Sequence, residues 1–294
     1  MQYFNYIAPK SVDEVLSVIA KQNGSAKILS GGTDLLVQLR EGRRKAGMVV
    51  DVKHIPELTE ISFDSRNGLR IGAAASCHEI CADANVDRYY PGLVDGIRLI
   101  GGIQIQNRAS VGGNLCNASP AADSIPALIV HEAICTLAGP NGRRTLPVEE
   151  FCIAPGQNAL LSGEMLVSIH VPAPKANTGG GYLRFIPRNE MDIAEVGAGA
   201  AVTLDEEKRR FVSGRIALGA VAPTPLPAPE AGAFLAGKEI TRTTIKEAAR
   251  MAQAIAKPIT DMRGTAEHRR HLCAVLVERV LDKAIERAGG KHAQ

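Results

Sequence analysis

The sequence predicts an α+β protein built from two α/β subdomains and a C-terminal domain with a small antiparallel sheet and helices. Three observations support this fold class. Short apolar runs alternate with amphipathic segments through the first half of the 294 residues, a glycine-rich passage follows, and three strand-like runs then precede two helical ones. With 45% hydrophobic and 22% charged residues, the chain can bury a sizeable core.

The first subdomain spans about residues 1–57. Its first helix begins at Ser11, and Glu14 three residues later completes the sequence pattern of a capping box. Val12, Val15 and Ile19 recur at helical spacing, so one face of this helix packs inward. We expect strands at 3–8, 26–29 and 48–52 and a second helix at 35–39, in the order β-α-β-α-β.

The second subdomain spans about residues 58–176. Asn67-Gly68 and Asn141-Gly142 are strong hairpin signals, and each lies between two apolar runs. Ser76 with Glu79 repeats the capping-box pattern. We expect strands at 58–63, 69–75, 134–137, 144–147 and 165–171, with helices starting after Ser76, covering 88–100 and running from Asp123 to His131.

Residues 173–181 combine Pro174 with three consecutive glycines and indicate a linker at the domain boundary. The C-terminal domain is expected to span 177–290. Its proline-rich passage at 223–229 cannot continue a sheet. We expect strands at 182–186, 194–204 and 215–221, followed by helices at 241–256 and 264–288.

Composition excludes several functions. A net charge of +3, 4% aromatic residues and no Trp argue against a nucleic-acid surface. No apolar run is long enough to span a membrane and the N-terminus lacks the pattern of a signal peptide, so we expect a cytoplasmic protein with free thiols. Of six cysteines only Cys77 and Cys81 are close in sequence, which argues against a zinc or iron–sulfur site in this chain.

A first glycine-rich turn joins an expected strand to an expected helix. Glycine there lets backbone N–H groups approach an anion closely, and a helix N-terminus adds partial positive charge. The turn therefore suits a pyrophosphate, although a turn of this kind on its own is more often a connection without a ligand. Its residues are Ile28, Leu29, Ser30, Gly31, Gly32, Thr33, Asp34 and Leu35.

A second glycine-rich segment follows about 75 residues later and reads as a polar loop. Its hydroxyl and amide side chains can hold ribityl and phosphate oxygens, and a carboxylate can accept a hydrogen bond from a sugar hydroxyl. The alternative is a structural loop in which Asp123 caps the next helix. Two such segments in one chain favour a nucleotide cofactor; the residues here are Ala109, Ser110, Gly112, Gly113, Asn114, Asn117 and Asp123.

Competing motifs are weaker. Gly197-Ala198-Gly199 approaches a dinucleotide fingerprint, but a strand rather than a helix is expected to follow it. His268 and His271 share a helix without a third metal ligand and indicate a solvated face. The G-x-S-x-G and P-loop patterns are missing from the sequence, so a hydrolase elbow and a nucleotide triphosphatase are not supported.

The two glycine segments, in this order and at this separation, resemble those of the FAD-binding medium subunits of the xanthine dehydrogenase and carbon monoxide dehydrogenase family. The resemblance covers nearly the whole chain. It extends to Phe4-Asn5-Tyr6-Ile7-Ala8-Pro9 near the start, Arg188-Asn189-Glu190-Met191-Asp192-Ile193-Ala194 past the linker, and Asp261-Met262-Arg263-Gly264-Thr265-Ala266-Glu267-His268-Arg269-Arg270 near the end.

The resemblance implies a vanillyl-alcohol-oxidase-type FAD fold with the flavin between two α/β subdomains. It implies that residues 28–35 hold the pyrophosphate and that the second segment forms the opposite wall. Ile100, Leu166 and Arg184 match positions near the flavin; Arg184 stands where some members have lysine, and the two are not equivalent. His268 replaces a tyrosine frequent in the family, with no functional consequence assigned.

The family also implies partners and a mechanism. Substrate is oxidised at a molybdopterin cofactor in a large subunit, electrons pass through 2Fe–2S clusters in a small subunit, and the FAD of this chain delivers them to an external acceptor. We name no catalytic residue here, because the cofactor carries the redox chemistry. The stretch from Cys116 to Cys152 lacks the cysteine-rich insertion of 4-hydroxybenzoyl-CoA reductases, so no cluster is expected in this chain. A stand-alone FAD oxidase and a non-enzymatic interaction protein are the alternatives.

Overall fold

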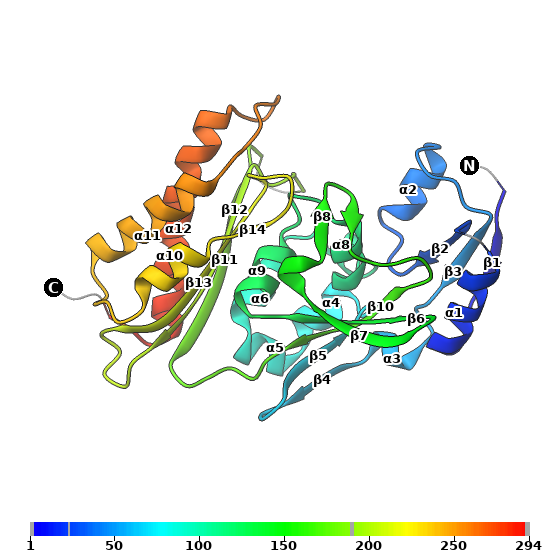
Figure 1. The fold of residues 1–294 in the computed structure, drawn as a ribbon, viewed down its shortest axis with the longest axis horizontal. Helices are drawn as coiled ribbons and strands as arrows, with labels where there is room; N and C mark the ends of the chain where they lie inside the picture. The colour runs from blue at the N-terminus through cyan, green and yellow to red at the C-terminus, as the bar shows by residue number, and fades with distance from the viewer. Residues whose placement is uncertain (1–2, 23, 189–190, 292–294) are drawn as a thin grey trace.

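Three units lie in a row along the molecule. The structure is a computed structural model that describes residues 3–22, 24–188 and 191–291. Figure 1 places the N-terminal unit at one end, a central unit with the largest sheet in the middle, and the C-terminal domain at the other end. Asn189 and Glu190, part of the motif quoted above, lie outside the described residues.

The first unit is a small three-layer subdomain around a parallel sheet of order β1-β3-β2. The Ser11 hydroxyl accepts from the backbone N–H of Glu14, whereas the Glu14 carboxylate accepts from the N–H of Lys10. Only half of the expected capping box is therefore formed. Its elements are β1 (Asn5–Ile7), α1 (Val12–Lys21), β2 (Ala26–Leu29), α2 (Leu35–Arg40) and β3 (Met48–Asp51).

The central unit carries an antiparallel sheet of order β4-β5-β10-β6-β7, and both expected hairpins are confirmed. The strands are β4 (Ile61–Asp64), β5 (Gly68–Gly72), β6 (Ile134–Gly139), β7 (Gly142–Pro147) and β10 (Met165–Val171), with a side ribbon of β8 (Cys152–Ala154) and β9 (Gln157–Asn158). The helices are α3 (Pro56–Thr59), α4 (Cys77–Ala82), α5 (Ala84–Tyr89), α6 (Pro91–Ile97), α7 (Ile103–Gln106), α8 (Val111–Asn117), α9 (Ser124–Val130) and the 3₁₀ turn η1 (Val148–Glu150).

Three expectations for this unit are wrong. The helix expected over 88–100 is divided into α5 and α6, because Tyr90 precedes Pro91 and leaves the helical region at φ −131° and ψ 49°. The strand expected from residue 58 begins at Ile61, since Pro56 opens the short helix α3 instead. The second glycine-rich segment is largely the helix α8 rather than a loop.

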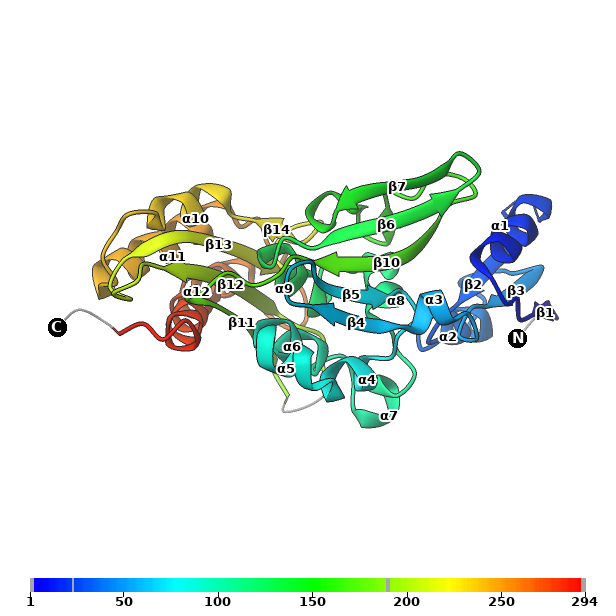
Figure 2. The same cartoon turned by 90° about the horizontal axis from the view of Figure 1, so that it is seen from below.

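The C-terminal domain is an antiparallel sheet of order β11-β12-β13-β14 with helices on one face (Figure 2). The glycines expected in a linker begin β11, and Leu226–Pro227 pairs with β13 as a two-residue edge strand, where proline is tolerated. One helix, α10, was not expected. The elements are β11 (Thr178–Phe185), β12 (Val196–Leu204), β13 (Phe211–Gly219), β14 (Leu226–Pro227), α10 (Pro229–Leu235), α11 (Arg242–Ile255) and α12 (Ala266–Arg287).

Close backbone packing explains the glycines at the start of β11. A Cβ on Gly179 would lie 2.2 Å from the carbonyl oxygen of Ala284 in α12, and one on Gly92 of α6 would lie 2.6 Å from the carbonyl carbon of Gly180. The central core continues into the C-terminal sheet through buried Tyr182. The two domains therefore share a packed seam rather than a loose connection.

An ion-pair cluster reinforces this seam. The Asp95 carboxylate of α6 accepts from Arg287 at 2.6 Å and from Lys283 at 3.0 Å, both on α12. The backbone N–H of Tyr182 donates to the same carboxylate. Among the described residues, no helix has the length and apolarity to cross a membrane.

Candidate flavin site

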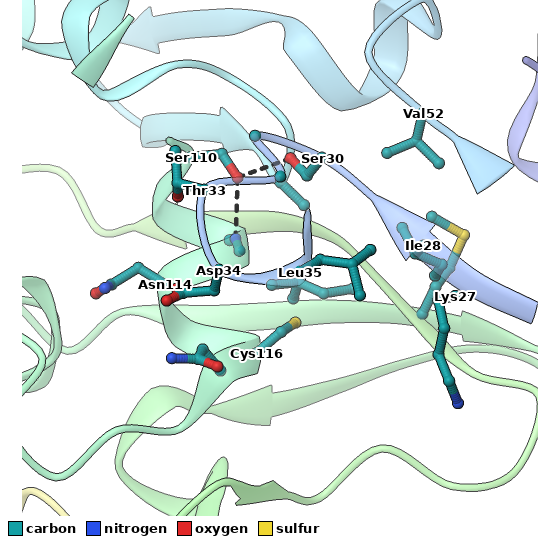
Figure 3. Close-up of a pocket in the computed structure, with 18 of the residues that line it drawn as sticks. Lys27, Ile28, Ser30, Thr33, Asp34, Leu35, Val52, Ser110, Asn114 and Cys116 are labelled. Carbon is teal, nitrogen blue, oxygen red and sulfur yellow. Dashed lines mark hydrogen bonds between the residues drawn. The ribbon is translucent and has the colours of Figure 1, made fainter. Parts of the chain in front are cut away.

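A cavity of about 340 Å³ opens between the N-terminal and central units, and both glycine-rich segments form its walls (Figure 3). The first segment joins β2 to α2, and the second is the start of α8. Segments that lie about 80 residues apart in sequence are joined here by one short contact, 2.7 Å between the hydroxyls of Ser30 and Ser110. The cavity is thus built where the two subdomains meet.

The first wall presents free backbone donors. Within the described part of the chain, the N–H groups of Gly31, Gly32, Thr33 and Asp34 donate no hydrogen bond to another protein group. Gly32 has φ +77°, a conformation that glycine adopts at little cost. Consecutive free N–H groups around such a turn form an anion-binding concavity. The wall therefore suits the oxygens of a pyrophosphate.

The second wall is fixed by Ser110 at the start of α8. Its hydroxyl accepts from the N–H of Gly113 at 3.0 Å while it also contacts Ser30 (Figure 3). A Cβ on Gly31 would lie 2.1 Å from the carbonyl oxygen of Arg108. Position 31 therefore has no room for a side chain, because the two walls touch there.

Amide and apolar side chains complete the cavity. Asn114 accepts from the Ser124 hydroxyl at 2.7 Å, and Asn158 donates to the carbonyl oxygen of Cys116 at 2.7 Å. These hydrogen bonds fix the two amides in place. Ile100 and Leu166 add apolar surface to the cavity.

Most residues named from the sequence meet at this cavity. It is lined by Ile28, Ser30, Gly31, Gly32, Thr33, Asp34, Leu35, Ile100, Ala109, Ser110, Gly112, Gly113, Asn114, Asn117 and Leu166. Leu29, Asp123 and Arg184 are not part of the lining. Their assignments to the cofactor stay predictions.

Asp123 and Arg184 form a buried pair behind the cavity wall. Asp123 does not cap α9 with its side chain; it accepts from Arg184 Nη1 at 2.6 Å and from the Tyr182 hydroxyl at 2.9 Å. Burial raises the pKa of Asp123 to about 6, although Arg184 and Tyr182 both favour the carboxylate. Arg184 Nε is buried and has no hydrogen-bond partner among the described residues.

Sequence reasoning missed several lining residues. Lys27 directly precedes the first glycine-rich segment, and Arg44 belongs to the basic run Arg43-Arg44-Lys45, which is a charge signal visible in the sequence. Asn158 and Glu164 come from the segment between β8 and β10, for which the sequence offers no signal. Glu164 is already paired with Arg144 at 2.7 Å.

The donor set fits FAD. Free N–H groups suit the pyrophosphate, hydroxyls and amides suit the ribityl chain, and apolar side chains suit the ring. Cys116 lines the cavity, and burial raises the pKa of its thiol to about 12, so it is not a thiolate at neutral pH. The described residues contain no cluster of side chains suited to a metal ion.

Two family models match this chain. The model described as the FAD binding domain in molybdopterin dehydrogenase matches residues 2–174, and that of the CO dehydrogenase flavoprotein C-terminal domain matches residues 181–284. The chain is 30% identical over 290 residues to the xanthine dehydrogenase FAD-binding subunit of Escherichia coli O157:H7, covering 98% of each chain. It is 33% identical over 281 residues to the carbon monoxide dehydrogenase medium chain of Hydrogenophaga pseudoflava, covering 96% of each.

Solved structures agree over the same length. A chain of the carbon monoxide dehydrogenase from Hydrogenophaga pseudoflava superposes with a TM-score of 0.92 at 33% identity, with 97% of this chain and 98% of that one covered. A chain of quinoline 2-oxidoreductase from Pseudomonas putida 86 gives 0.90 at 30% identity, with 98% of each covered. The chain belongs to the family of FAD-binding medium subunits of the molybdenum hydroxylases, which are oxidoreductase complexes such as xanthine and carbon monoxide dehydrogenase.

Proposed function

We propose that this chain binds one FAD without a covalent bond and relays electrons within a heterotrimeric molybdenum hydroxylase. Electrons would reach the flavin from 2Fe–2S clusters in a small partner subunit and leave to an external acceptor. The large partner would carry the molybdopterin cofactor. The observation that carries the proposal is the cavity between two glycine-rich walls with four free backbone donors on one side.

Each wall has a separate role in this proposal. Residues 28–35 bind the pyrophosphate with backbone N–H groups. Ala109, Ser110, Gly112, Gly113, Asn114 and Asn117 bind the ribityl side, while Ile100 and Leu166 contact the ring. Asp123 and Arg184 contribute charge and a free donor from behind the wall. When bound, FAD supplies the redox chemistry, and the side chains of this chain bind it, orient it and exclude water.

We further propose a FAD-binding domain at 1–176, with subdomains at about 1–57 and 58–176, and a C-terminal domain at 177–290. The complex is proposed to be a dimer of heterotrimers in the cytoplasm, with the small 2Fe–2S and large molybdopterin subunits as partners. The cysteines that the structure describes are all free thiols. Alone, the chain would not oxidise the substrate of the complex.

Purification of the untagged complex from its source cells tests the proposal. Native mass spectrometry should find three different subunits, and the visible spectrum should contain flavin and iron–sulfur absorption. A homogeneous species made only of this chain and active on substrate would support the stand-alone oxidase instead. A colourless protein after gentle purification would support a non-enzymatic interaction protein.

A further inference from the structure

Two features of the C-terminal domain are not explained by cofactor contacts. One is buried Tyr182 on β11, 2% exposed, whose hydroxyl crosses the seam to Asp123 at 2.9 Å. The other is the Gly197-Ala198-Gly199 run on β12, which is a strand and not a dinucleotide fingerprint. The geometry joins these two features.

Gly197 makes room for the Tyr182 hydroxyl. A Cβ on Gly197 would lie 2.3 Å from the hydroxyl oxygen and 3.1 Å from the ring carbon that bears it. Gly199, which pairs with Tyr182 across the sheet, would bring its own Cβ within 3.0 Å of the carbonyl oxygen of Pro126 in α9. The two glycines thus let the tyrosine reach Asp123 and let α9 lie flat on the sheet.

Asp123 connects this contact to the cavity. The next residue, Ser124, donates to Asn114, which lines the cavity. Arg184, the other partner of Asp123, also donates to the carbonyl oxygen of Leu99, next to lining residue Ile100. The Asp123 carboxylate therefore lies between two wall segments, one at Asn114 and one at Ile100. Its own position depends on two side chains of β11, Tyr182 and Arg184.

We propose that Tyr182 is a positioning residue of the flavin site, which couples docking of the C-terminal domain to the cavity by holding the Asp123 carboxylate. The inference rests on the proposed function and extends it to a residue outside the cavity lining. Among the described residues, the Tyr182 hydroxyl hydrogen-bonds to Asp123 and not to a lining residue, so Tyr182 acts through Asp123. Removal of that hydroxyl should weaken FAD binding about tenfold, the lower end of what a hydrogen bond to a charged group contributes, because Tyr182 acts on the cavity through Asp123.

The charged surroundings of Asp123 allow a pH test. Its facing groups are Tyr182 and Arg184. On other elements packed around α9, Asp95 pairs with Arg287 and Lys283, and Glu149 pairs with Arg215. Burial raises the pKa of the Cys116 thiol on α8 to about 12, Glu150 of η1 is exposed, and His131 donates to a carbonyl oxygen within α9 itself. Because the Tyr182 hydroxyl favours the carboxylate, its removal should raise the pH at which FAD affinity changes.

The experiment compares Tyr182→Phe with Tyr90→Phe in the assembled complex. Tyr90 is also buried and donates to the carbonyl oxygens of Pro172 at 3.0 Å and Val171 at 3.5 Å, so its variant loses only neutral hydrogen bonds, and these lie within the central unit. FAD dissociation constants are measured by flavin fluorescence from pH 5 to 8, with thermal unfolding of the flavin-free complex as a second readout. We expect weaker binding and a pH break shifted upward in Tyr182→Phe only.

A double-variant cycle protects the test against simple misfolding. Gly197→Ala should weaken FAD binding in the wild-type background and much less in Tyr182→Phe, because the atom that its Cβ meets first has gone. Equal FAD affinity and pH profile in Tyr182→Phe and Tyr90→Phe would overturn the inference. A wild-type complex that binds no FAD would overturn the proposed function instead, so the two failures are distinguishable.

Discussion

Replacing Gly31 by alanine tests whether the two cavity walls must touch. The new Cβ would lie 2.1 Å from the carbonyl oxygen of Arg108 and 2.7 Å from the Cα of Ala109. Both atoms belong to backbone, so no side-chain rotation can relieve the contact. The walls must separate, and the hydrogen bond between Ser30 and Ser110 lengthens with them.

The expected magnitude follows from the clash. Overpacking a well-packed site costs about 1–3 kcal/mol, and a backbone contact at this distance belongs at the upper end. For a chain of this size that corresponds to a decrease in Tm of roughly 5 °C or more. FAD content should fall as well, because the donors of one wall no longer face the hydroxyls and amides of the other.

Gly102→Ala is the matched control. Gly102 has φ −92°, and its Cβ would meet only side-chain atoms at 3.4 Å or beyond, an ordinary contact. Its effect should stay within about 0.5 kcal/mol. Thermal unfolding and flavin-to-protein absorbance ratios are measured for both variants in the complex. If Gly31→Ala matched Gly102→Ala in both measurements, the account of wall contact would be refuted.

Three further predictions follow from single contacts. Asp95→Asn should lower the free energy of unfolding by about 2 kcal/mol, as measured by chemical denaturation. This value lies between those of exposed and buried ion pairs, because the Asp95–Arg287 pair is partly buried. Burial opposes ionisation of Asp95, but Arg287 and Lys283 lower its pKa overall, so this stabilisation is present above about pH 4 and is lost as the pH falls through the lowered value. Acid precipitation should release all flavin to the supernatant in wild type and Cys116→Ala alike; colour in the wild-type pellet would indicate a covalent bond to the thiol. Gly113→Ala should leave Tm nearly unchanged, because two effects oppose each other. Alanine favours the helix by about 1 kcal/mol, whereas its Cβ would lie 2.9 Å from the Ser110 hydroxyl and displace it. The displaced hydroxyl should still reduce FAD content.

Local chemistry made much of the fold predictable. The strands at 26–29 and 165–171 and both Asn-Gly hairpins are confirmed, because apolar runs and turn residues are local signals. Ser76 with Glu79 forms a complete capping box. Pro91 is also a local signal for the division between α5 and α6. The helical spacing of the apolar residues around it nevertheless predicts one continuous helix.

Tertiary packing determines the features of the fold and the site that the sequence could not predict. The glycines at 179–181 have the composition of a linker, yet they form a strand because α12 and α6 approach their backbone. Asn158 enters the cavity from a ribbon whose position depends on Cys116 more than 40 residues earlier. Family resemblance indicates Arg184 as a site residue, but its pairing with Asp123 depends on the docked C-terminal domain.

A glycine-rich segment can indicate either close packing of protein backbone or a backbone site for a ligand, and the glycines of this chain show both. The segment Gly31-Gly32 suggested backbone approaching a phosphate, and the structure divides that role between neighbours. A side chain at Gly31 would collide with the backbone of Arg108, while Gly32 adopts the positive φ of a turn whose four N–H groups have no hydrogen-bond partner among the described residues. Gly112 is likewise demanded by the carbonyl oxygen of Ala73 at 2.3 Å. A pair of glycines therefore indicates that another group lies close to the backbone. Only neighbouring N–H groups without a protein partner indicate that this group is a ligand and not another part of the protein.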